Sequence, residues 1–136
     1  MTTKPESLLG KKVQTNLPKS HITRLESRVG LGIPDMLIAL YPEGLFVMLE
    51  LKVVQKGKKV NLSPHQISFL IKHSQLGAPV FILVQHKLLG GVSNYLSLYK
   101  GGQAIEVFER GIDAPFLLRY PASSVDWSEI RKMLLT

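Results

Sequence analysis

The chain has 136 residues, which favours one domain spanning residues 1–136 with its own core. It has no cysteine, so disulfides, thiolate metal sites and a cysteine nucleophile are excluded. No apolar run approaches the roughly 18 residues of a membrane span, and the first residues lack a signal-peptide core. We therefore expect a cytoplasmic protein without a membrane partner. The formal net charge of +7 predicts a polyanionic partner, nucleic acid first, although a merely basic protein is the alternative.

The first half of the chain predicts one helix followed by three extended segments. Residues 5–16 carry apolar side chains at helical spacing, and the Leu17-Pro18 pair ends that helix. Residues 21–28 are expected as a short strand or extended segment, and residues 33–40 as a strand. Residues 45–54 form a largely apolar run that predicts a strand buried on both faces.

The second half begins with a helix whose start is clearly marked. Ser63 suits the N-cap, Pro64 the first helical position, and Gln66 the third position of a capping box. This helix and the apolar residues 80–84 complete a βαβ unit. Residues 94–99 and 104–109 are interpreted as a hairpin turning at two glycines, and a last helix runs from Asp126 to about residue 135. The order predicts an α/β fold with a mixed sheet.

Three charged side chains interrupt the apolar stretches of the second and third strands. Asp35 begins one strand, and Glu50 and Lys52 lie near the end of the next on a common face. If the two strands pair as a hairpin, Asp35 and Glu50 meet at one edge of the sheet. Two adjacent carboxylates favour a hard divalent cation, and a nearby lysine can orient or deprotonate water or offset transition-state charge. The alternative is a buried Glu50–Lys52 pair that holds strand register, with Asp35 capping a turn.

This pattern resembles the motif of the PD-(D/E)xK nuclease superfamily. Pro34-Asp35, a gap, and Glu50-Leu51-Lys52 match it, and GIPDMLIA with LSPHQISFLIKHSQLGAPVFILV resembles archaeal-type Holliday junction resolvases and VRR-NUC domains. The resemblance covers about residues 5–85. It implies a restriction-endonuclease-like αβββαβ core with a mixed sheet, to which this chain would add a C-terminal β-hairpin and helix.

The resemblance also implies the members of a metal site. Asp35 and Glu50 would bind Mg²⁺, with Mn²⁺ as a substitute and the Leu51 carbonyl as a further ligand. Gln66 would join the site, unless it only caps its helix. An upstream acidic residue is implied as well, and two candidates remain open. Glu26, a metal ligand in this reading, is slightly favoured over Glu6; their alternatives are a surface ion pair and a carboxylate at a helix start.

Basic residues near this motif are candidates for DNA contacts. Phosphate binding by clustered lysines and arginines is strongly salt-dependent, whereas a plain solvated loop makes no such contribution. The predicted DNA-binding residues are Lys56, Lys58, Lys59, Arg24, Arg28 and His65.

The expected function is a metal-dependent DNA endonuclease. By resemblance, the substrate is branched or Holliday-junction DNA in recombination or repair, and the product carries a 5′-phosphate. Two symmetric nicks predict a C₂ homodimer, and the small size suits a phage or mobile element, which would place the protein in a host cytoplasm. The alternatives are a sequence-preferring nicking, restriction or homing-type endonuclease, a DNA-binding subunit of the same fold without activity, and an unrelated α/β binding protein.

Overall fold

The computed structural model describes residues 4–25, 31–88, 91 and 93–136. Six strands form one sheet in the order β1-β2-β3-β4-β5-β6. All neighbours pair antiparallel except β3 and β4, which are parallel. The sheet is therefore mixed, as the sequence predicts. The strands are β1 (Ser20–Arg24), β2 (Met36–Leu40), β3 (Leu45–Val53), β4 (Val80–Lys87), β5 (Asn94–Lys100) and β6 (Leu118–Pro121).

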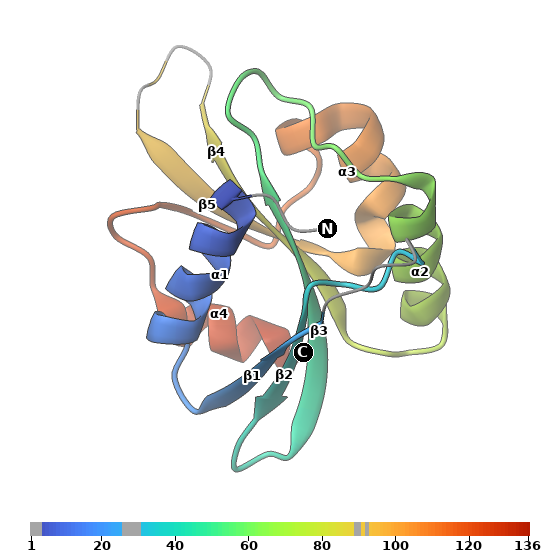
Figure 1. Cartoon of the computed structure of the whole chain (residues 1–136), viewed down its shortest axis with the longest axis vertical. Helices are drawn as coiled ribbons and strands as arrows, with labels where there is room; N and C mark the ends of the chain where they lie inside the picture. Colours follow the sequence, from blue (N-terminus) through green and yellow to red (C-terminus); the bar gives the residue numbers. More distant parts are fainter. Residues whose placement is uncertain (1–3, 26–30, 89–90, 92) are drawn as a thin grey trace.

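Helices cover both faces of this sheet (Figure 1). The helices α1 (Lys4–Asn16) and α4 (Trp127–Leu134) lie on one side, and α2 (Pro64–Gln75) and α3 (Ala104–Arg110) lie on the other. Two short 3₁₀ turns, η1 (Gly101–Gln103) and η2 (Gly111–Asp113), flank α3. Among the described residues, no helix is long and apolar enough to cross a membrane.

The two faces of β3 belong to different apolar clusters. Leu49 and Leu51 are buried with residues of α1 and α4, whereas Met48 packs against the cluster that includes α2 and α3. Alternate strand residues point to opposite faces, so an apolar strand covered on both sides needs apolar residues at nearly every position. The prediction that β3 is buried on both faces is confirmed. A polar side chain in the buried part of β3 is therefore unusual.

The expected αβββαβ order is confirmed, but the first two strands differ from their predicted bounds. The strand expected over residues 33–40 begins at Met36. Pro34 has no backbone N–H and cannot donate to a sheet ladder. The extended segment predicted at residues 21–28 is a strand only to Arg24, and residues 26–28 lie outside the described residues.

The predicted hairpin of residues 94–99 with residues 104–109 is wrong. The second segment is helix α3, and the antiparallel partner of β5 is β6 beyond it. Ala104 and Val107 are the buried residues of α3, and their i, i+3 spacing is helical. Gly101 starts η1 where any Cβ would lie 2.7 Å from the Val80 carbonyl oxygen. The glycine pair therefore permits a close backbone approach instead of a hairpin turn.

A buried polar cluster fastens the end of α3 to β5. The Tyr99 hydroxyl donates a hydrogen bond to the Ile112 carbonyl at 2.8 Å, and Arg119 donates to the same carbonyl at 2.6 Å. Arg119 Nε also donates to Ser97 Oγ at 2.6 Å, and Ser97 pairs with buried His86 at 2.7 Å. Buried polar groups need such partners. The C-terminal third of the chain is thus tied to the sheet by side chains as well as by strand pairing.

Candidate active site

Strand register brings Asp35 and Glu50 together. In the antiparallel β2–β3 pair Met36 lies opposite Leu49, so one step further along the register Asp35 faces Glu50. Asp35 Oδ2 accepts a hydrogen bond from the Leu51 backbone N–H at 2.9 Å, which fixes the carboxylate against the end of β3. The prediction that these two carboxyl groups meet at the edge of the β2–β3 hairpin is confirmed.

Two side chains hold the Glu50 carboxyl in place. Gln66 Nε2 donates a hydrogen bond to Glu50 Oε2 at 3.1 Å, and Lys52 Nζ lies 3.6 Å from the same oxygen. The exposed fraction of the side chain is 2% for Glu50 and 12% for Lys52. Glu50, Lys52 and Gln66 therefore form one connected group, in which the Lys52 side chain is more exposed than that of Glu50.

Gln66 has two tasks, because its amide has two ends. Its Oε1 accepts a hydrogen bond from the Ser63 N–H at 2.9 Å, while Ser63 Oγ accepts one from the Gln66 N–H at 3.1 Å. This is the capping box that the sequence predicts for the start of α2. The Nε2 end donates its hydrogen bond to Glu50, so the same residue caps the helix and contacts the carboxyl pair.

Burial makes Glu50 a weak acid. Desolvation and then the neighbouring Asp35 charge raise the pKa of Glu50 to about 9, and these outweigh the opposing Lys52 ammonium. A side-chain hydrogen bond to Asp35 adds to the rise, because the protonated form of Glu50 supplies the donor. Without a cation, burial and the Asp35 charge therefore favour the protonated form of Glu50.

The loop before Asp35 rests on the first turn of α2. Gly32 has φ +75°, and a Cβ there would lie 2.2 Å from the His65 carbonyl oxygen. Only glycine accommodates both this backbone angle and this contact. The close neighbour of Gly32 is therefore the start of α2. This contact sets the position of Gln66 relative to Asp35.

The donor set fits a magnesium ion. Mg²⁺ accepts one or two protein carboxylates and keeps several waters or phosphate oxygens. Within the described part of the chain no cluster of three or more metal-binding His, Asp or Glu side chains occurs, so a cation here would depend on Asp35 and Glu50. The Asp35 charge disfavours a second negative charge on Glu50, and a cation between the two carboxyl groups would offset that repulsion. The role of the Leu51 carbonyl stays a prediction.

Of the two upstream acids, the structure describes only Glu6. Its negative charge contributes to the raised pKa of Glu50, which places it within electrostatic reach of the site. Glu26 lies outside the described residues, as does Arg28. Arg24 packs against Gly10 and donates to the Ser7 carbonyl at 3.4 Å. Arg24 therefore links β1 to α1, and its DNA contact stays a prediction.

The basic loop lies directly after β3. Lys56, Lys58 and Lys59 are exposed, as is His65 at the start of α2. Lys58 forms a 2.7 Å ion pair with Asp113 of η2, a partner that sequence reasoning did not find. The sequence interpretation missed this pair because it placed residues 104–109, now seen as α3, in a hairpin strand.

One solved structure with a similar fold is that of Hjc, a Holliday junction resolvase from the archaeal hyperthermophile Archaeoglobus fulgidus. The likeness covers 87% of this chain and 86% of that one, with a TM-score of 0.50 and 13% sequence identity. No protein-family model and no curated protein matches the sequence. At this identity the likeness establishes the fold, which is the predicted α/β restriction-endonuclease-like class.

Proposed function

We propose that the protein is a Mg²⁺-dependent endonuclease that hydrolyses DNA phosphodiester bonds. The observation that carries this proposal is the buried Glu50 carboxyl, opposite Asp35 and joined to Lys52 and Gln66. A strand interior stabilised only by packing would have no need of a carboxylic acid with so high a pKa. Perturbed acids beside a charge partner are typical of functional sites.

Each residue then has a distinct role. Asp35 and Glu50 would hold the cation, with Gln66 fixing the orientation of Glu50. A bound Mg²⁺ supplies charge stabilisation and lowers the pKa of water. Lys52 Nζ, whose side chain is more exposed than that of Glu50, would orient the attacking water and offset the charge of the phosphorane-like transition state. Attack breaks the bond from phosphorus to the 3′ oxygen, which takes up a proton, and leaves a 5′-phosphate.

We further propose branched DNA as the substrate and a C₂ homodimer as the active species. The similar fold of a Holliday junction resolvase and the net charge of +7 support this choice. A four-way junction offers two equivalent strands, which a two-fold symmetric dimer can cut in pairs. On β3, Phe46 is 60% exposed and faces the same way as its neighbour Ala39 on β2, so this apolar patch is available for a second copy.

The proposal is tested by cleavage of labelled DNAs of matched sequence. A four-way junction, a flap, a single strand and a plain duplex are each incubated with Mg²⁺, with Mn²⁺ and with EDTA. Lys52→Ala should lose cleavage and keep DNA binding, whereas Lys132→Ala, the same charge change on the exposed side of α4, should keep both. Cutting by Lys52→Ala at the wild-type rate would remove Lys52 from the mechanism.

The pattern of products separates the remaining alternatives. Paired symmetric nicks in the junction support a resolvase-like enzyme. Cutting of plain duplex at one site indicates a sequence-preferring nicking, restriction or homing-type enzyme. Tight, salt-sensitive binding without cutting of any substrate would instead identify a DNA-binding subunit that lacks the chemistry.

A further inference from the structure

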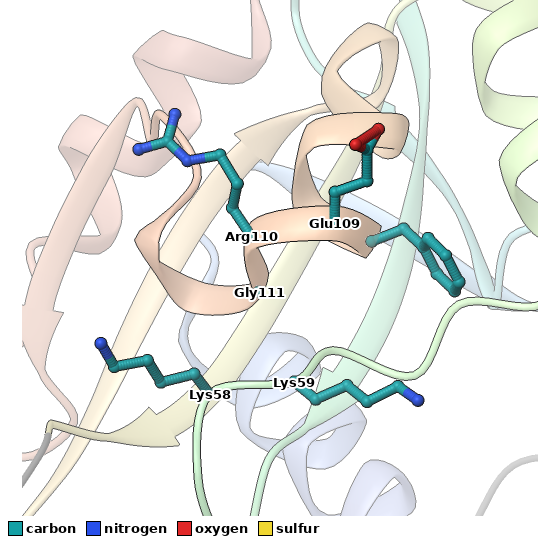
Figure 2. A pocket seen from close by; sticks show the side chains of 6 residues that line it. Lys58, Lys59, Glu109, Arg110 and Gly111 are labelled. Carbon is teal, nitrogen blue, oxygen red and sulfur yellow. The ribbon is translucent and has the colours of Figure 1, made fainter.

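A groove lies between the basic loop and the end of α3, beyond the end of β3 (Figure 2). Its volume is about 440 Å³, which is enough for part of a nucleotide strand. Both walls carry long side chains, and one wall carries an aromatic ring. The lining residues are Lys58, Lys59, Phe108, Glu109, Arg110 and Gly111.

The backbone of this groove is firmly built. The Ile112 N–H donates to the Lys58 carbonyl at 2.9 Å. Gly111 has φ +62°, and a Cβ there would lie 2.0 Å from the same carbonyl oxygen. Val60 and Ile112 are buried beneath the contact. The loop is thus attached to the end of α3 through main-chain atoms, and its side chains project from a fixed base.

The charges in the groove are not all paired. Lys58 is bound to Asp113, which leaves that pair nearly neutral. Neither Lys59 nor Arg110 forms an ion pair with any residue in the described ranges. In Figure 2 the Arg110 side chain extends from the end of α3 to the upper left, and the Lys59 side chain extends from the basic loop to the right. Two diverging cations suit successive phosphates along a strand better than one small anion.

Phe108 adds an exposed aromatic ring, on which a base of double-stranded DNA cannot stack. Its side chain is 43% exposed although it is large and apolar. Exposed aromatic rings beside cations are the usual platform for single-stranded nucleic acid, because a base stacks on the ring while phosphates meet the cations. A base inside a duplex is already stacked on both sides and is unavailable for this contact.

We infer that this groove binds an unpaired nucleotide of the DNA substrate, with its base on Phe108 and adjoining phosphates on Lys59 and Arg110. The inference rests on the proposed function, because Lys58 follows Lys52 by only six residues. An extended chain of that length spans at most about 20 Å, so one DNA strand can reach both sites. The groove would therefore select DNA that opens or branches within a few nucleotides of the cut.

The test measures binding of two DNAs in EDTA, so that cleavage plays no part. One is a duplex with a single-stranded arm, and the other is a continuous duplex of the same sequence. Stacking of one base contributes about 1–3 kcal/mol, so Phe108→Ala should weaken binding of the armed DNA about 5- to 150-fold. It should change duplex binding less than about twofold. Tyr41→Ala, an exposed aromatic at the β2–β3 turn, is the matched control and should change neither.

A spectroscopic variant distinguishes stacking from general loss of affinity. Phe108→Trp should bind the armed DNA as wild type does, and its added fluorescence should be quenched by that DNA but not by the duplex. The inference would be overturned if Phe108→Ala lost the same affinity for both DNAs. It would also be overturned if an acidic peptide, and neither DNA, quenched the fluorescence of Phe108→Trp.

These outcomes are separable from the fate of the nuclease proposal. If Phe108→Ala cleaved and bound DNA as the wild type does, nucleotide binding in the groove would be refuted and the proposed active site would be unaffected. If the armed DNA alone quenched Phe108→Trp, and the protein cut no DNA, nucleotide binding in the groove would be supported and the nuclease proposal refuted.

Discussion

Replacing Glu50 by glutamine should make the metal-free protein more stable at neutral and alkaline pH. Glutamine has nearly the shape of a protonated glutamic acid, and Glu50 holds its proton in the fold. The folded pKa is about 9, against an ordinary value of 4.5 in the unfolded chain. Because the folded pKa is raised, this contribution to stability is fully present below about pH 4.5. It is lost progressively as the pH rises towards 9.

The size of the effect follows from proton linkage. Each pH unit between the two pKa values removes about 1.36 kcal/mol, since the unfolded state releases a proton that the folded state keeps. Between pH 5 and pH 8 the free energy of unfolding of the wild type should fall by about 4 kcal/mol through Glu50. Glu50→Gln has no proton to release and should not show this fall.

Urea denaturation in EDTA at pH 5, 6, 7 and 8 measures the prediction. The informative quantity is the difference between Glu50→Gln and wild type, because it cancels other titrating groups such as His86. Glu109→Gln, at an exposed position on α3, controls for the loss of one negative charge. Parallel curves for Glu50→Gln and wild type would show that Glu50 is ionised in the fold. The Lys52 ammonium would then outweigh burial and the Asp35 charge, contrary to our reasoning.

Three further outcomes are expected. Gly32→Ala should lower the free energy of unfolding by more than about 2 kcal/mol and reduce cleavage, because its Cβ would clash with the first turn of α2. Gly44→Ala is the control: Gly44 also has a positive φ, +69°, but open space around it, so the loss should be only about 1 kcal/mol. Tyr99→Phe should cost about 1 kcal/mol in urea denaturation, since Arg119 still satisfies the shared carbonyl. Replacing Lys56, Lys58 and Lys59 by alanine should lower the slope of log Kd against log salt by about 2 to 3; an unchanged slope would remove the basic loop from the DNA.

The αβββαβ core was predictable because its signals are local. The cap at Ser63, the apolar run of β3 and the alternation of Glu50 and Lys52 each depend on residues close together in sequence. The error at residues 104–109 has the opposite origin. A segment with two buried residues and a preceding glycine pair fits a helix or a strand. The outcome depends on distant residues, because Gly101 packs against Val80 and β6 takes the position beside β5.

The site was predictable to the extent that strand register is. Placing Asp35 opposite Glu50 required only a tight β2–β3 turn, and the turn residues supply it. The groove could not be predicted from the sequence, because the Lys58–Asp113 ion pair depends on how α3 and η2 lie against the basic loop. The contact of Gly32 with α2 likewise joins segments more than thirty residues apart. Long-range contacts of this kind leave no periodicity in the sequence.

The capping box and the candidate active site depend on one side chain. Gln66 accepts from Ser63 with one end of its amide and donates to Glu50 with the other. A glutamate at this position would complete the same cap but would bring another negative charge beside Glu50 and Asp35. An amide avoids that repulsion and supplies a donor, which a carboxylate lacks. The cap alone therefore does not explain glutamine here, whereas the need for a donor to the buried Glu50 carboxyl does.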